Sequence, residues 1–185
     1  MVEITKEDID RELAGKGDFV RLDRIENFLK QTKSLDIRKF LLVKQAEIYE
    51  NKGMLSEAAR IHDALAHLSL TFSDKTNQHM KETELYIRAG LLEQADLSMK
   101  KAMSELDDKQ KEGIKKRIIE FYVNHGSALE KAQRRAQAIK LYEKMITMHY
   151  LSAGDKDNVN KRLLGLYEQT GKIREFFNLK NKLSV

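Results

Sequence analysis

The sequence predicts an all-α protein, and three observations support this fold class. The 185 residues contain no Pro and only nine Gly, while Ala, Leu, Lys, Glu and other helix-favouring residues fill the long stretches between glycines. The strict alternation of apolar and polar residues that marks a half-buried strand is missing. A Tyr followed four residues later by a Gly occurs in YENKG, YIRAG, YVNHG and YEQTG. This recurrence indicates helices that end at regular intervals.

Glycines at a regular spacing divide the chain into units. The five glycines are Gly17, Gly53, Gly90, Gly126 and Gly171. Their separations are 36, 37, 36 and 45 residues, by subtraction of the residue numbers. One helical turn before them stand Leu13, Tyr49, Tyr86, Tyr122 and Tyr167. Each glycine is predicted to lie where one helix ends and the chain reverses, since glycine adopts a left-handed backbone at little steric cost.

A second helix is predicted to follow each glycine, with apolar or small residues five, eight and twelve places beyond it. These positions hold Leu22, Ile25 and Leu29; Ala58, Ile61 and Leu65; Ala95, Ser98 and Ala102; and Phe176, Leu179 and Leu183. In the fourth unit the set comes seven residues late, as Ala138, Leu141 and Met145. Seven residues are nearly two helical turns, so the buried face keeps its register. Because SALE at 127–130 has the pattern of a capping box, the extra turns are predicted in a helix that begins there.

Five such hairpins would bury a continuous core only by stacking, so residues 1–185 are predicted to form a single domain. The chain resembles the tetratricopeptide repeat family in its aromatic residue before the turn Gly, in Ala58 and Ala95 nine residues after that aromatic, and in the segment AIKLYEKM at 138–145. The resemblance implies a right-handed superhelical solenoid of about five antiparallel helical hairpins. The chain departs from the family in having no Trp and no Pro. An irregular helical bundle is the alternative.

The sequence offers little catalytic or cofactor chemistry. It has no Cys, no Gly-rich phosphate loop, no GxSxG and no HExxH segment, and its five His form no pair three or four residues apart on one helix. We therefore expect a protein that is not an enzyme and that has no cofactor and no metal. The charged N-terminal stretch and the absence of any apolar run near the ~20 residues of a membrane span predict no membrane association and a cytoplasmic location.

Basic residues recur nine places before four of the turn glycines. They are Lys44, Lys81, Arg117 and Arg162, and Lys116 and Lys161 directly precede two of them. In the family that the chain resembles, the first helices line the concave side, so these residues are predicted to supply charge to one groove. The alternative is that they form intrahelical ion pairs with Glu47, Glu84 and Glu120. Arg162 has Gly165 at that place, so we expect it to be the basic residue most available to a partner.

These patterns predict a protein interaction module or scaffold that binds an acidic peptide or helix in a basic groove. Residues 1–92 carry 15 basic and 16 acidic side chains, and residues 93–185 carry 19 basic and 13 acidic ones, a net charge of +6. The excess gathers at 109–117 and 130–140, so a helical protein that binds nucleic acid through residues 109–140 is the alternative. Aromatic residues are not interleaved with these basics, which disfavours single-stranded RNA.

The C-terminal segment IREFFNLKNKLSV carries too many apolar residues for one narrow stripe. Phe176 and Leu179 fit the repeated buried positions, whereas Phe177 does not. We therefore expect Phe177 to lie on an exposed patch that contacts a partner protein or a second copy in a homodimer. The alternative is that a tilt of the terminal helix buries this side chain.

Overall fold

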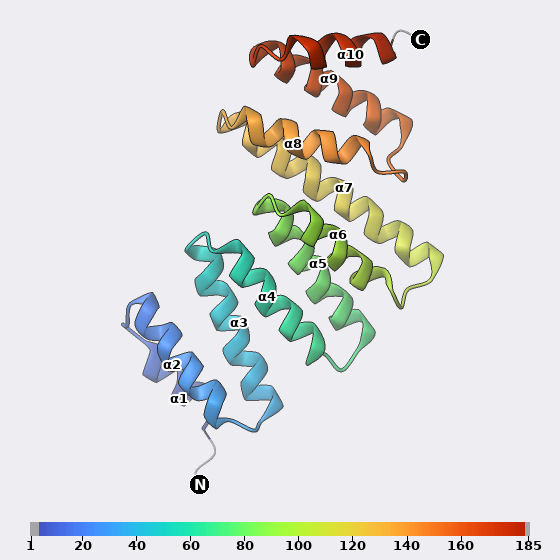
Figure 1. Ribbon diagram of the computed structural model, residues 1–185. Helices are drawn as coiled ribbons and strands as arrows, with labels where there is room; N and C mark the ends of the chain where they lie inside the picture. The colour runs from blue at the N-terminus through green and yellow to red at the C-terminus, as the bar shows by residue number, and fades with distance from the viewer. Residues whose placement is uncertain (1–3, 184–185) are drawn as a thin grey trace. The chain divides into compact units, whose positions relative to one another are not determined.

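The computed structural model describes residues 4–183, which form ten α-helices and no strand (Figure 1). The helices are α1 (Lys6–Leu13), α2 (Asp18–Gln31), α3 (Leu35–Asn51), α4 (Leu55–His67), α5 (Phe72–Arg88), α6 (Leu92–Met103), α7 (Asp108–Lys131), α8 (Arg135–Ile146), α9 (Ala153–Gln169) and α10 (Ile173–Leu183). The predicted all-α class is confirmed.

The contacts within the chain divide it into two compact units, Met1–Glu105 and Leu106–Val185. In the first unit, consecutive helices from α2 to α6 pack against one another. In the second unit, α7 packs on α8, α8 on α9, and α9 on α10. Within each unit the elements α3 and α4, α5 and α6, and α7 and α8 run side by side as pairs (Figure 1). The superhelical stacking of all hairpins and the single domain over 1–185 stay predictions.

Odd-numbered and even-numbered helices begin in different ways. Side chains cap the start of each odd-numbered helix: Thr5, Ser34, Thr71, Asp107 and Ser152 accept a hydrogen bond from a backbone N–H in the first turn. The helices α2, α4, α6 and α8 begin directly after a turn, without a side-chain cap. The capped starts therefore follow the polar connections between pairs, and the uncapped ones follow the tight turns within pairs.

The tight turns before α4, α6, α8 and α10 have the same hydrogen-bond pattern. A residue with positive φ stands two places after the end of each first helix, and the N–H of the following residue donates to the carbonyl oxygen five residues earlier. The donor and acceptor pairs are Met54 to Tyr49, Leu91 to Tyr86, Arg134 to Leu129, and Lys172 to Tyr167, at 2.8 to 2.9 Å. The positive-φ residues of these four turns are Gly53, Gly90, Gln133 and Gly171. Turns at Gly53, Gly90 and Gly171 are thus confirmed.

The predicted turn at Gly126 is wrong. α7 continues to Lys131, and Gln133 takes the left-handed conformation with φ of 59°. The extra two turns therefore lie at the end of the first helix, and residues 127–130 start no helix. Gly126 is buried inside α7, and glycine is required there because a Cβ would lie 2.5 Å from the ring of Tyr142. Gly17 also differs from the prediction: it is the N-cap of α2, and the positive φ belongs to Gly15.

The core follows the predicted stripes most closely in the middle of the chain. Ala58, Ala95, Ser98, Ala138, Leu141 and Met145 are all buried. Ala58, Ala59 and Leu85 form one cluster of the first unit, against which Tyr49 and Tyr86 pack. At the C-terminal end, Phe176 and Leu179 are only half-buried, and α10 has no fully buried residue. Terminal helices have a neighbour on one side only, so this loss of burial is expected.

Candidate functional site

The turn after α7 lies at Gln133 and not at Gly126. This changes which residues occupy the same position in successive hairpins. Nine places before the four positive-φ residues stand Lys44, Lys81, Asn124 and Arg162, by subtraction from 53, 90, 133 and 171. Arg117 lies seven residues earlier on α7 than Asn124 and does not belong to this set. The prediction that placed Arg117 in one series with the other three residues is therefore wrong, because it assumed a turn at Gly126.

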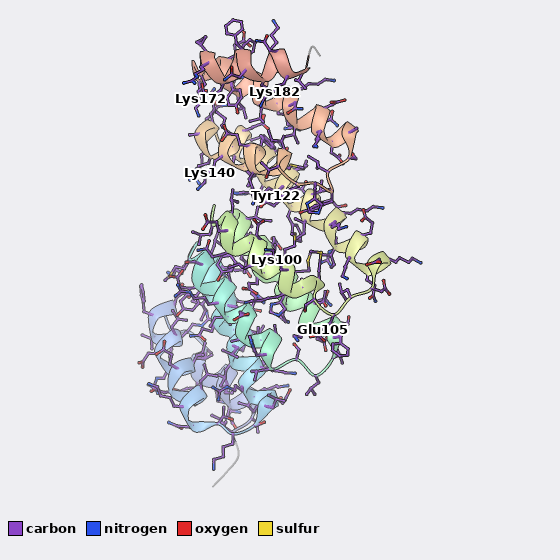
Figure 2. The ribbon with its side chains drawn as sticks, turned by 45° about the vertical axis from the view of Figure 1, so that its right-hand side comes forward. Lys100, Glu105, Tyr122, Lys140, Lys172 and Lys182 are labelled. Atoms are coloured by element: carbon purple, nitrogen blue, oxygen red, sulfur yellow. The ribbon has the colours of Figure 1, made fainter. Side chains whose placement is uncertain are left out.

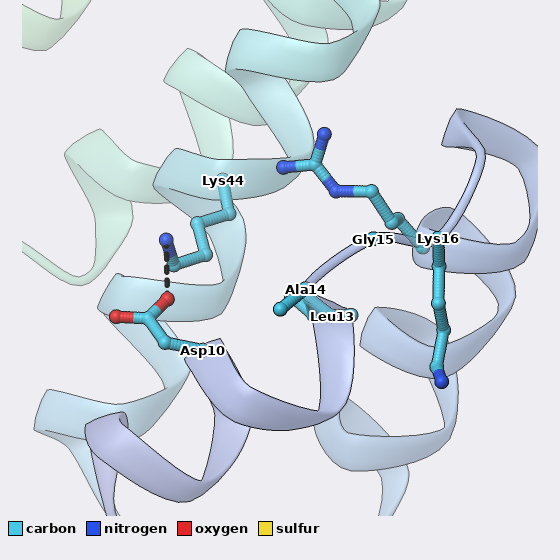
Figure 3. Close-up of a pocket in the computed structure, with 7 residues that line it drawn as sticks. Asp10, Leu13, Ala14, Gly15, Lys16 and Lys44 are labelled. Carbon is cyan, nitrogen blue, oxygen red and sulfur yellow. Dashed lines mark ion pairs between the residues drawn. The ribbon is translucent and has the colours of Figure 1, made fainter.

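Lys44 contacts the first helix instead of open solvent. Its Nζ lies 2.7 Å from Asp10 Oδ1, and it lies over the ring of Phe40 at 4.7 Å from the centroid. Figure 3 shows this ion pair at the edge of a small pocket of about 190 Å³, which Lys16 also lines. Lys16 pairs with Glu12 at 3.9 Å. The charge of Lys44 is thus already balanced within the first unit.

Lys81 and Arg162 repeat one ion pair between successive first helices. Lys81 on α5 lies 3.2 Å from Glu50 on α3, and Arg162 on α9 lies 2.7 Å from Glu130 on α7. Both acids lie three places before a positive-φ residue, and both bases lie nine places before the next one. Lys81 also contacts Glu84 at 3.5 Å, which confirms one of the predicted intrahelical pairs. Among residues 4–183, Lys44 with Glu47 and Arg117 with Glu120 form no such pair.

The prediction that Arg162 is the most available basic residue is wrong. Its guanidinium donates to Glu130 Oε1 at 2.7 Å and to the Tyr142 hydroxyl at 3.3 Å. The hydrogen bond to Glu130 raises the pKa of Arg162 above its usual value. Tyr142 donates to the same oxygen at 2.6 Å, and burial together with this bond raises its pKa to about 12. Glu130, Tyr142 and Arg162 therefore join α7, α8 and α9.

Lys116, Arg117 and Lys161 remain exposed, and no carboxylate of the described residues lies within ion-pair distance of them. They do not gather at one point. Arg117 lies thirteen residues before Glu130 on α7, about 20 Å at 1.5 Å per residue, whereas Lys161 is next to the Arg162 that Glu130 contacts. Lys44 and Lys81 belong to the other unit. A single groove lined by all six basic residues stays a prediction.

Phe177 lies on the exposed side of α10, as predicted, with 54% of its surface accessible. Ile173, one turn earlier, is 61% exposed. Lys172 and Lys182, which lie at the two ends of α10 in Figure 2, and Arg174 have no acidic partner among residues 4–183. An apolar pair with basic neighbours therefore faces solvent. Its contact with a partner or with a second copy stays a prediction.

A charged cluster in the first unit was missed by the sequence analysis. His79 and Glu82, both on α5, are almost fully buried, and His79 Nδ1 lies 2.9 Å from Glu82 Oε2. Asp63 on α4 lies 3.9 Å from His79 Nδ1. The Lys101 ammonium on α6 lies 2.7 Å from Asp63 Oδ1 and 3.5 Å from Glu82 Oε1. Burial opposes the charge of Lys101, but the hydrogen bonds to Asp63 and Glu82 outweigh it and raise the pKa of Lys101.

One sequence signal could have found part of this cluster. His79 and Glu82 are three residues apart, which places them on the same face of a helix. A His paired with an acid is a less specific signal than the pairs of His that mark zinc sites. Asp63 could not have been added, because its approach to α5 depends on how α4 and α5 pack.

The comparisons with known proteins identify no relative of this chain: no family model, no curated protein and no solved structure matches it. In the part of the chain that the structure describes, no helix combines the length and the apolar character needed to cross a lipid bilayer.

The ion pair between Glu130 and Arg162 is expected to contribute modestly to the stability of the second unit. In a double-mutant cycle of Glu130→Gln and Arg162→Gln, we expect a coupling free energy of about 0.5 to 1 kcal/mol, because both side chains are partly exposed. Chemical denaturation of the four proteins measures this coupling. The same cycle with Lys161→Gln in place of Arg162→Gln is the control and should give a coupling near zero. Equal coupling free energies in the two cycles would contradict the ion pair between Glu130 and Arg162.

Proposed function

We propose that this chain is a non-enzymatic protein interaction module, a stack of tetratricopeptide-like hairpins whose second unit binds an acidic helix or peptide of a partner protein. The observation that carries the proposal is the exposed face of α10. Ile173 and Phe177 lie one turn apart on it, both more than half exposed. Large apolar side chains grouped on a surface are typical of binding sites.

The charge of the second unit supports an acidic partner. Residues 106–185 carry 17 basic and 10 acidic side chains, a net charge of +7. Lys172 and Arg174 flank Ile173 in the sequence, Lys182 lies further along α10, and none of the three has an acidic partner among the described residues. Acidic side chains around an apolar stripe would complement this face. The same charge disfavours a homodimer through α10, since two such faces would repel each other.

The basic residues predicted from the sequence take different roles in this proposal. Lys44, Lys81 and Arg162 are held by Asp10, Glu50 and Glu130, so they stabilise the packing of the helices. Lys116, Arg117 and Lys161 are exposed and contribute to the positive field that attracts an acidic partner. Charges outside the contact act mainly on the association rate.

A labelled amphipathic peptide with Leu along one helical face and Glu on the other tests the proposal. We expect it to bind the wild type, and we expect Phe177→Asp to weaken binding at least about tenfold, since exposed aromatic anchors dominate such contacts. Phe19→Asp is the matched control, because Phe19 is also exposed but lies on α2 of the first unit. Lys161→Glu should slow association and leave folding unchanged. Fluorescence anisotropy and stopped-flow measurements give these quantities.

Three outcomes would contradict the proposal. Equal binding by the wild type and by folded Phe177→Asp would remove α10 from the contact. Binding of duplex DNA or RNA at physiological salt with a steep salt dependence, without binding of the peptide, would favour the nucleic-acid alternative. Light scattering distinguishes a homodimer from a contact with a partner protein. A dimeric wild type and a monomeric Phe177→Asp would assign the patch to self-association.

A further inference from the structure

The cluster of Asp63, His79 and Glu82 has the composition of a metal site. One ligand atom from each of the three side chains lies within 4.8 Å of the other two. They provide one imidazole nitrogen and two carboxylate oxygens, which are donors that Zn²⁺ and similar ions bind. The three come from two packed helices, α4 and α5, so the fold and not a local loop holds them together.

The burial of Glu82 favours a cation at this place. The side chain of Glu82 is only 4% exposed, and a buried carboxylate is costly unless a positive charge or hydrogen bonds compensate it. His79 Nδ1 lies within hydrogen-bond distance of Glu82, and the Lys101 ammonium, which contacts both Asp63 and Glu82, adds the positive charge. The Lys101 side chain is 44% exposed. A cation therefore sits between Asp63 and the buried Glu82, but it is carried by a side chain with room to move into solvent.

We propose that Asp63, His79 and Glu82 bind a divalent transition-metal ion, with Zn²⁺ the best candidate, when the Lys101 ammonium moves out of the cluster. Zn²⁺ takes nitrogen and oxygen ligands at about 2.0 to 2.2 Å, which places tetrahedral ligand atoms about 3.4 Å apart. Side-chain rotation of Asp63, which is partly exposed, closes the remaining distance. Water supplies the fourth ligand.

The structure offers a route by which an ion reaches these ligands. Glu82 and Lys101 line an open pocket of about 390 Å³, together with Tyr86 and Leu97. When Lys101 turns outward, Glu82 faces this pocket. The imidazole and the two carboxylates favour Zn²⁺ over Mg²⁺ and Ca²⁺, which prefer sites made of oxygen alone. This inference is independent of the proposed partner contact on α10, which lies in the other unit.

Removal of the competing ammonium gives the sharpest test. We expect tag-free Lys101→Gln protein to bind one Zn²⁺ per chain at least about tenfold more tightly than the wild type, measured by isothermal titration calorimetry. Lys100→Gln is the matched control, since Lys100, labelled in Figure 2, is the neighbouring exposed lysine on α6. It lines the same pocket but forms no ion pair among residues 4–183. It should bind Zn²⁺ as the wild type does. Co²⁺ should give the visible absorption of a four-coordinate site.

The ligands are tested in the Lys101→Gln background. Adding Asp63→Asn should lower the Zn²⁺ affinity at least about tenfold, whereas adding His67→Ala should leave it unchanged. If Lys101→Gln unfolds without metal, recovery of its helical circular dichroism on addition of Zn²⁺ supports the site, and failure to recover overturns it. Absence of Zn²⁺ binding by folded Lys101→Gln overturns the proposal. So does binding that depends on the exposed His67 but not on Asp63.

Discussion

Gly126→Ala is expected to destabilise the second unit by about 1 to 3 kcal/mol, although alanine normally favours helices. Gly126 is buried within α7, and a Cβ there would lie 2.5 Å from the ring of Tyr142. That ring is fully buried, and its hydroxyl is bonded to Glu130, so it has little room to move. Thermal unfolding and hydrogen exchange of residues 106–183 measure the effect.

Gly113→Ala is the control for this substitution. Gly113 lies in the same helix, and nothing comes within 4 Å of a Cβ built there. This change should therefore stabilise the protein by about 0.5 to 1 kcal/mol, the ordinary difference between Ala and Gly in a helix. Changes in stability of opposite sign at the two glycines would show that Gly126 is needed for close packing against Tyr142. If both substitutions stabilised the protein, the close contact with Tyr142 would be wrong.

Ala58→Phe is expected to cost the first unit on the order of 1 to 3 kcal/mol or more, since overpacking forces a close-packed core to rearrange. Ala58 is fully buried on α4 in the cluster with Ala59 and Leu85. Ala89→Phe is the control, because Ala89 is exposed at the end of α5. It should shift the midpoint of thermal unfolding little. Equal shifts for the two variants would contradict the packing of α4 against α5.

The sequence by itself was sufficient for the helical class and for most turns. Helix-favouring residues without Pro determine the class, because local backbone preferences act within one turn of the chain. Gly53, Gly90 and Gly171 mark turns for a similarly local reason, since their positive φ suits glycine. The buried stripe of Ala138, Leu141 and Met145 was also predicted correctly, even though the turn before it was placed seven residues too early.

The misplaced turn shows what local sequence patterns cannot determine. Seven residues are nearly two helical turns, so their insertion before or after a turn leaves the apolar stripe in the same register. A glycine inside a helix and a glycine at a turn look alike in sequence. The Tyr142 ring, which occupies the space beside Gly126, decides between them, and it comes from the next helix.

The tertiary structure alone determined which charged residues are bonded between different helices. Arg162 has no acid at the helical spacing that the sequence analysis considered, yet it contacts Glu130, which is 32 residues away. Asp63 and Lys101, which are 38 residues apart, meet in the same way beside His79 and Glu82. Sequence periodicity indicates which face of a helix a residue occupies, whereas its ionic partner depends on the packing of that face against another helix. The charge on Arg162 was therefore visible in the sequence, and its neutralisation was not.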